Sequence, residues 1–226
     1  CWPNTTTPDG RDVVAPQIDD ARVRAVTGDL SDPAVLAQAI DRDTGAIFHL
    51  AAVVSGQAEA DFDLGMRVNL DASRALLETC RQLAHAPRVV FTSSVAVYGG
   101  KLPPVVQDDT ALNPQSSYGV QKAIGELLLS DYSRRGFVDG RVLRLPTISV
   151  RPGKPNAAAS SFASGIIREP LSGVAANCPV APETPLWLLS PRGAIQALVN
   201  GIELDGARFG NRRVVNLPGL SVTAAQ

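Results

Sequence analysis

A tyrosine and a lysine four positions apart, Tyr118 and Lys122, are the residues whose types and spacing best suit acid–base chemistry. A serine cap and the apolar spacing around them predict an amphipathic helix, in which residues four apart share a face. An ammonium close to a tyrosine lowers its pKa from about 10, and the phenolate can then take the proton of a substrate hydroxyl. On spacing alone, a packed aromatic beside a solvated lysine is the simpler interpretation. The buried face of this helix is expected to carry Ile124, Leu127 and Leu128.

Apolar stretches that end in small or hydroxylated residues precede this helix. Residues 46–50 predict one buried strand, which runs into Ala51 and Ala52, and residues 88–91 predict another, which runs into a serine-rich turn with Ser94. Strands that alternate with helices predict a parallel sheet, whose ligands lie beyond the carboxyl ends of the strands. Further strands are predicted over residues 22–30 and 141–153, and further helices over residues 34–40 and 66–83.

Residues 46–52, 88–100 and 116–129, in this order, resemble the extended short-chain dehydrogenase/reductase family, which includes the NAD-dependent epimerases and dehydratases of nucleotide sugars. The resemblance covers nearly all of the chain. It implies an α/β fold of the Rossmann type, a doubly wound parallel sheet. It also implies an NAD-binding domain over residues 1–150 and a smaller C-terminal substrate-binding region over residues 151–226, some segments of which return to the Rossmann core.

The resemblance implies a role for each of Ser94, Tyr118 and Lys122. Ser94 would hydrogen-bond the substrate hydroxyl, Tyr118 as phenolate would take its proton, and Lys122 would lower the pKa of Tyr118 and hold the nicotinamide ribose. Asp12 would accept hydrogen bonds from the adenosine ribose and repel a 2′-phosphate, which favours NAD over NADP. Asp12 also fits a solvated loop, and Asp29 also fits a helix cap. Besides Asp12, Tyr118 and Lys122, the expected NAD contacts are Asp29, Leu30, Leu50, Ala51, Ala52, Asn69, Pro146 and Thr147.

Beyond Gly153 the composition shifts to small and hydroxylated residues with several cations among them. An arginine in such a segment can bind a carboxylate through two hydrogen bonds. The segment resembles the branch of the family that uses NAD to oxidise the C2 hydroxyl of a four-carbon sugar acid to a 2-keto acid. The expected substrate contacts are Ser55, Ser94, Tyr118, Arg151, Asn156, Ser161 and Arg192.

Two alternatives stay open at this stage. One is a nucleotide-sugar epimerase or dehydratase with the same serine, tyrosine and lysine, although Phe162 and Trp187, the aromatic residues between Arg151 and Arg192, offer little platform for a nucleobase. The other is a non-catalytic NAD-binding relative or an inactive fragment. The glycine-rich turn that carries the pyrophosphate in the family does not occur in the sequence. We therefore expect an interior part of a longer protein that by itself binds NAD weakly.

Composition excludes several other classes of function. The 226 residues carry a net charge of −1 and are 45% hydrophobic, which predicts a soluble cytoplasmic protein without nucleic-acid or membrane partners. Three widely spaced cysteines and two histidines predict neither a metal site nor a disulfide framework. His49 is interpreted as a core residue. A small sugar acid is the expected partner, and a homodimer is left open.

Overall fold

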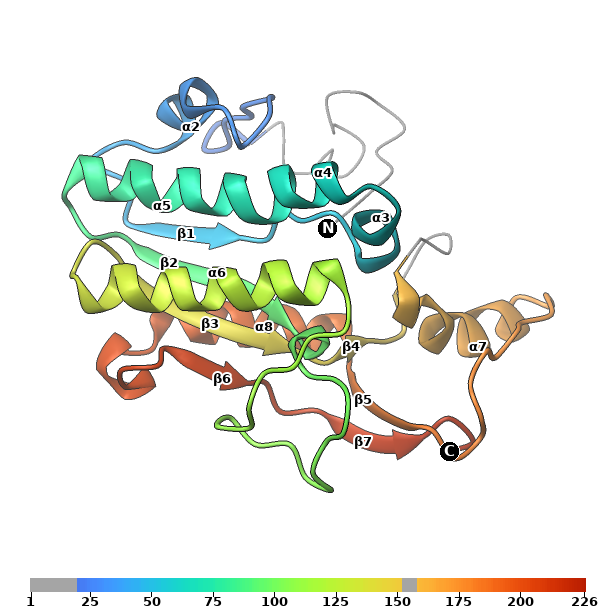
Figure 1. Cartoon of the computed structure of the whole chain (residues 1–226). Coiled ribbons are helices and arrows are strands. Elements are labelled where there is room, and N and C mark those ends of the chain that lie inside the picture. Colours follow the sequence, from blue (N-terminus) through green and yellow to red (C-terminus); the bar gives the residue numbers. More distant parts are fainter. Residues whose placement is uncertain (1–19, 152–157) are drawn as a thin grey trace.

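The computed structural model describes residues 20–151 and 158–226 and places a four-stranded parallel sheet at its centre (Figure 1). The strand order is β1-β2-β3-β6. Phe91 pairs with His49, and Ser94 pairs with Leu145, so the carboxyl ends of β1, β2 and β3 meet at one edge. The predicted α/β fold with a parallel sheet is therefore confirmed. The strands are β1 (Ala46–His49), β2 (Arg88–Ser94), β3 (Asp139–Leu145) and β6 (Val214–Asn216).

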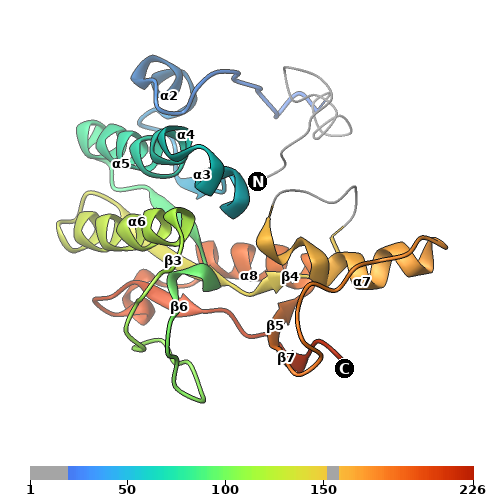
Figure 2. The ribbon, with the colours of Figure 1, turned by 45° about the vertical axis from the view of Figure 1, so that its right-hand side comes forward.

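Helices cover both faces of this sheet (Figure 2). On one face lie α5 (Ala72–Leu83) and α6 (Ser117–Arg134), and α2 (Pro33–Ala39) packs against α5; α8 (Pro191–Glu203) lies on the other face. Successive side chains of a strand point to opposite faces. Val89 and Phe91 of β2 accordingly join the core beneath α5 and α6, whereas Val90 joins the core beneath α8.

The helix predicted over residues 66–83 is present, but its first part is π-helical. It follows α4 (Phe62–Gly65) as η1 (Met66–Asp71) and continues without a break into α5. Ser73 Oγ donates to the Asn69 carbonyl at 2.8 Å, at the junction of the two forms. Short π-helical stretches inside α-helices are frequent at functional sites.

The buried face expected for α6 was wrong. Leu127 is 67% exposed, and Ile124 and Leu128 are only partly buried. Lys122 and Glu126 are buried instead, and each is 2% exposed. The physical reason is that both charged side chains find polar partners on the strands beneath them, so this face of the helix can be buried although it is polar.

The strand predicted over residues 22–30 was also wrong. This stretch has no ladder partner among the described residues, and a strand without a partner is not stable. The helix predicted after it is confirmed as α2. Asp32 caps this helix, since its Oδ1 accepts a hydrogen bond from Ala34 N at 2.8 Å, and Pro33 occupies the first helical position.

The C-terminal part of the chain contributes to the main sheet and forms a second, small one. The strand predicted over residues 141–153 divides into β3 and β4 (Thr147–Ile148). In the second sheet β5 (Pro185–Leu189) pairs with β4 and with β7 (Leu220–Thr223). The remaining elements are α3 (Ser55–Ala60), η2 (Val95–Val97), η3 (Ala159–Ser161), α7 (Phe162–Leu171) and η4 (Gly206–Phe209).

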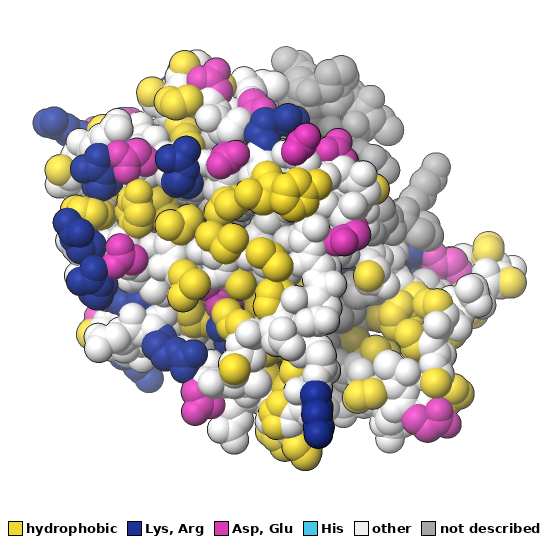
Figure 3. All heavy atoms as spheres, viewed as in Figure 1, with side chains coloured by type: hydrophobic (Ala, Val, Ile, Leu, Met, Phe, Trp, Pro, Cys, Tyr) yellow, Lys and Arg dark blue, Asp and Glu magenta, His cyan; other side chains and the backbone are white. Residues whose placement is uncertain are grey.

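Apolar side chains gather on the outer surface of α5 and α6, as Figure 3 shows. Val120 and Leu127 are the large exposed apolar residues of α6. None of the helices within residues 20–151 and 158–226 is both long enough and apolar enough to span a membrane.

Candidate active site

Ser94, Tyr118 and Lys122 come together at the carboxyl ends of the strands. Ser94 is the last residue of β2, and Tyr118 and Lys122 lie one turn apart at the start of α6. Ser116 fixes that start, because its Oγ accepts a hydrogen bond from Gly119 N at 3.2 Å. Tyr118 hydrogen-bonds Ser94, and Lys122 Nζ lies 5.8 Å from the centre of the Tyr118 ring.

Lys122 points inward and is held by the strand beneath it. Its Nζ donates to the Thr92 carbonyl at 2.8 Å and lies 4.6 Å from the centre of the Phe91 ring. Burial lowers the pKa of Lys122 to about 8, and the negative charge of Glu126 opposes that fall. Burial, with a smaller effect of the Lys122 charge, lowers the pKa of His49 to about 3, so His49 is a neutral core residue as expected.

The pKa of Tyr118 differs from the expectation. Burial raises it above its ordinary value, and the hydrogen bond with Ser94 offsets only part of that rise. The expected lowering by Lys122 was therefore wrong for the chain in this state. The ammonium donates to the Thr92 carbonyl and lies beside the ring, which leaves the desolvation of the phenol dominant. Tyr118 consequently keeps its proton at neutral pH.

Asn69 connects the loop after β1 to the helix that carries Tyr118 and Lys122. Asn69 is 1% exposed, and its Oδ1 accepts from Val53 N at 2.8 Å while its Nδ2 donates to Val53 O at 3.2 Å. The same Nδ2 donates to Gln121 Oε1 at 2.8 Å. Asn69 therefore braces the loop after β1 against α6, and its expected contact with NAD stays a prediction.

The other residues expected to contact NAD lie at several strand ends. Ala52 is buried after β1, and Leu50 beside it is 41% exposed. Asp29 does not cap α2; its carboxylate accepts from Ser31 N at 2.8 Å and lies 3.5 Å from the Arg67 guanidinium. Leu30 is partly buried against the core beneath α5, and Ala51 is also partly buried. Pro146 joins β3 to β4, and Thr147 is the first residue of β4. Asp12 lies outside the described residues.

On the substrate side, Ser55 lies close to the segment that opens α7. Its Oγ accepts from Ala159 N at 3.1 Å, which brings Ser55 close to Ser161 in the following turn. Asn156, expected in the same segment, lies outside the described residues.

Two arginines expected to bind the substrate have different surroundings. The Arg151 backbone N–H donates to Ser164 Oγ at 3.0 Å, and the Arg168 guanidinium donates to the Arg151 carbonyl at 2.6 Å. Burial, and to a smaller extent the positive charge of Arg168, lower the pKa of Arg151, and the Arg168 guanidinium itself pairs with the Glu169 carboxylate. Arg192 is exposed in the first turn of α8, and the structure gives it no contact with the other expected site residues that it describes.

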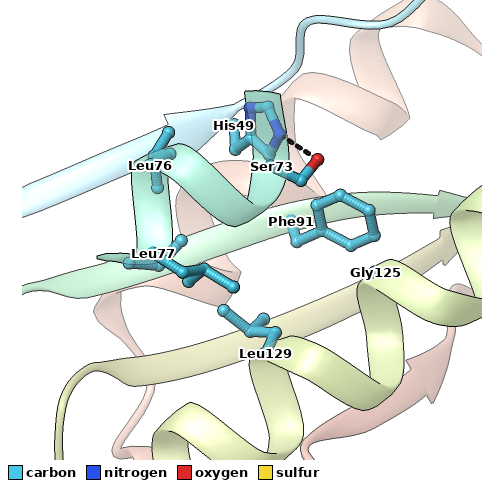
Figure 4. A pocket seen from close by; sticks show the side chains of 8 residues that line it. His49, Ser73, Leu76, Leu77, Phe91, Gly125 and Leu129 are labelled. Atoms are coloured by element: carbon cyan, nitrogen blue, oxygen red, sulfur yellow. Dashed lines mark hydrogen bonds between the residues drawn. The ribbon is translucent and has the colours of Figure 1, made fainter. Parts of the chain in front are cut away.

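Two hollows lie away from this group of residues. A cavity of about 10 Å³, shown in Figure 4, lies in the core between α5, α6 and the sheet, where His49 Nε2 bonds Ser73 Oγ at 2.7 Å. It has room for at most one water molecule. A hollow of about 520 Å³ lies between the C-terminal ends of α2 and α5. Since α5 leads there into the start of β2, this hollow is at the opposite edge of the sheet from Ser94.

Comparison with known proteins agrees with this geometry. The model of the NAD dependent epimerase/dehydratase family matches residues 4–183. The chain belongs to this family. It is 92% identical over 215 residues to D-erythronate dehydrogenase from Cupriavidus necator, with 95% of the chain and 66% of that protein covered. It is 51% identical to D-erythronate dehydrogenase from Haemophilus influenzae, with 94% and 67% covered. The chain thus spans about two thirds of the length of the curated relatives it matches.

Solved structures of the family share the fold. The chain is 51% identical to the nucleoside-diphosphate-sugar epimerase from Agrobacterium tumefaciens, with a TM-score of 0.84 over 89% of the chain and 60% of that structure. A GalE-like L-threonine dehydrogenase from Cupriavidus necator gives a TM-score of 0.84 over 97% of the chain and 77% of that structure at 22% identity, which bears on the fold alone.

Sequence reasoning missed four polar residues that pack against this group. Gln121 bonds Asn69, and Glu126 is bonded by Ser93 and Arg144. A signal for Glu126 was present, since a carboxylate four residues after Lys122 shares its helix face. A signal for Arg144 was present as well, because a charged residue inside the apolar strand Val142–Leu145 needs a buried partner.

Proposed function

We propose that the whole protein uses NAD to oxidise the C2 hydroxyl of a four-carbon sugar acid, converting D-erythronate to 2-dehydro-D-erythronate. The grouping of Ser94, Tyr118 and Lys122 at the strand ends is the observation that carries the reaction type. The 92% identity to a D-erythronate dehydrogenase supports the choice of substrate.

The described residues fit the nicotinamide half of NAD. Ala51 and Ala52 follow β1 with short side chains, so a ligand can approach the backbone there. An ammonium has three N–H donors. One of those on Lys122 goes to the Thr92 carbonyl, which leaves two for ribose hydroxyls. When bound, NAD supplies the acceptor for the hydride that leaves C2.

The side chains of the site handle the proton. Ser94 donates to or accepts from the C2 oxygen and orients it, and Tyr118 in its deprotonated form takes the hydroxyl proton. Because burial raises the pKa of Tyr118, this step becomes easier as pH rises and as positive charge gathers near the phenol. Lys122 supplies part of that charge, since it is protonated below its pKa of about 8.

Arg151 is the proposed partner of the substrate carboxylate, with Ser55 and Ser161 near the sugar hydroxyls. The division into an NAD-binding domain over residues 1–150 and a substrate-binding region over residues 151–226 belongs to the same proposal. It is supported by the positions of β1, β2, β3 and α6 on one side of this boundary, although β6 and α8 return to the main sheet. A cytoplasmic location fits a metabolic dehydrogenase.

A nucleotide-sugar epimerase is the second candidate. The observation in its favour is the 51% identity to a solved protein named as a nucleoside-diphosphate-sugar epimerase. Both reactions would use the same serine, tyrosine and lysine. They differ in outcome, because an epimerase returns its hydride to the sugar and accumulates no NADH. A non-catalytic NAD-binding role would give neither outcome.

A substrate panel separates these functions. The whole protein is supplied with NAD and with D-erythronate, other aldonates, neutral sugars or UDP-sugars, and NADH absorbance and products are followed. We expect NADH with D-erythronate above all. Epimerisation of a UDP-sugar without a signal from any aldonate would establish the second candidate instead. Arg151→Ala should raise KM for the acid at least tenfold, since a charged hydrogen bond contributes about 1.5–3 kcal/mol.

A further inference from the structure

A buried ion pair lies one helical turn beyond Lys122. Glu126 and Arg144 have side chains that are each 2% exposed, and Arg144 donates to the carboxylate through Nη2 at 2.6 Å and through Nε at 2.9 Å. Ser93 Oγ donates a third hydrogen bond to Glu126 Oε1 at 2.5 Å. The carboxylate therefore ties α6 to β2 through Ser93 and to β3 through Arg144.

The guanidinium of Arg144 has further partners on its other side. Arg144 Nη1 donates to Tyr98 Oη at 2.5 Å, and Tyr98 Oη in turn donates to Asn216 Oδ1 at 2.9 Å. The network thus crosses from α6 to β6.

Replacing a buried ion pair by apolar residues of similar volume is often neutral or stabilising. Stability alone is therefore a weak reason for charges in this position, and the location beneath the candidate active site suggests another.

The charged and titratable groups around Lys122 come from α6 and β1, and Arg144 of β3 pairs with Glu126 but is not among the charges that shift the pKa of Lys122. Tyr118 and Glu126 share its helix, and His49 on β1 is neutral. The strand beneath, β2, offers the Phe91 ring and the Thr92 carbonyl, neither of which is charged. In the part of the chain that the structure describes, Glu126 is the one carboxylate found to act on the charge of Lys122.

We propose that Glu126 is a positioning residue: held by Ser93 and Arg144, its carboxylate fixes α6 on the strand ends and keeps Lys122 charged beside Tyr118. Ser93 directly precedes Ser94, so the same contacts set Ser94 against Tyr118. This inference rests on the proposed function, in which Lys122 acts as a cation. It assigns to Glu126 no contact with substrate or cofactor.

The test measures the protonation of Lys122 directly, by NMR of the whole protein labelled with ¹³C in lysine, with the Lys122 signal identified by its absence from Lys122→Met. The main variant combines Glu126→Gln with Arg144→Met, so that no buried charge is left unpaired. We expect a folded protein in which the titration midpoint of Lys122 falls by about one unit or more. A tenfold change in the protonation equilibrium corresponds to one unit. We also expect kcat to fall about tenfold while KM for the acid changes little.

The matched control is Asp131→Asn, which removes a carboxylate from the exposed surface of the same helix, where it pairs with Arg134. It should leave both the midpoint and kcat unchanged. A wild-type Lys122 midpoint in the folded double variant would overturn the inference. If that variant does not fold, Ser93→Ala provides the test, because it keeps both charges. We expect its kcat to fall several-fold. A wild-type kcat would overturn the positioning role. The titration needs no substrate, so a lack of sugar-acid activity would count against the proposed function alone.

Discussion

The contact between Gly119 and Ala96 sets how closely Tyr118 approaches Ser94. A Cβ atom at Gly119 would lie 2.2 Å from the Ala96 carbonyl oxygen. Ordinary contact begins at 3.4 Å, so Gly119→Ala must move the start of α6 and the turn η2 apart by about 1.2 Å. The obstacle is a backbone carbonyl in a turn, which cannot rotate away as a flexible side chain could.

This displacement falls within the candidate active site. Tyr118 immediately precedes Gly119, and Ser94 Oγ accepts a hydrogen bond from Ala96 N at 3.1 Å. A misplacement of about 1 Å in a reacting group can cost on the order of 100-fold in rate. We therefore expect kcat of Gly119→Ala to fall about 100-fold. Overpacking at the same position should cost about 1–3 kcal/mol of the free energy of unfolding.

The assay is steady-state NADH formation by the whole protein, run beside thermal unfolding. Gly45→Ala is the matched control, because no atom lies within 4 Å of the Cβ it would add. It should leave kcat unchanged. A folded Gly119→Ala protein with the wild-type kcat would refute the reasoning that this contact sets the separation of Ser94 and Tyr118.

Three further outcomes are expected. Tyr118→Phe should lower NADH formation by about 10²–10⁴-fold with little change in thermal unfolding, because the ring is kept and the proton acceptor is lost. Burial lowers the pKa of Lys122 from 10.5 to about 8. Between pH 8 and 10.5 the unfolded chain therefore binds more protons than the folded one, and the wild type gains stability as the pH rises. Lys122→Met should lack this gain in urea unfolding between pH 8 and 10.5. Asn69→Asp should lose ~2–4 kcal/mol of stability by calorimetry, since a carboxylate cannot donate to Val53 O or Gln121.

The elements of the central sheet could be predicted because their signals are local. Buried parallel strands appear as short apolar runs, and residues 46–50 and 88–91 are such runs. The cap of α2 also has a local signal, since the Asp32-Pro33 pair satisfies orphan N–H groups and fixes φ at the start of the helix, although Asp29 was the cap residue expected. The strand predicted over residues 22–30 was wrong for the opposite reason. Alternation is a property of one segment, whereas a strand also needs a partner elsewhere in the chain.

In the candidate site, the sequence could predict only those residues whose own type and spacing indicate chemistry. Tyr118 and Lys122 were found because four-residue spacing places them on one face. The pKa of Tyr118 could not be predicted in the same way, because it depends on how deeply the phenol is buried and on where the Lys122 ammonium donates its hydrogen bond. Those are consequences of packing against β2, where Ser94 lies 24 positions before Tyr118 and Thr92 lies 30 positions before Lys122.

The orientation expected for α6 was wrong for the same reason, because it also depends on packing against the strands. A helix shaped by packing alone would bury Leu127 and expose Lys122 and Glu126, which is the reverse of what is found. Burying Lys122 costs stability, as its lowered pKa records. Violations of the packing rules that carry such a cost are expected at functional sites rather than in ordinary cores. The inverted face of α6 is therefore independent support for placing the chemistry there, since it uses neither the motif spacing nor the similarity to known enzymes.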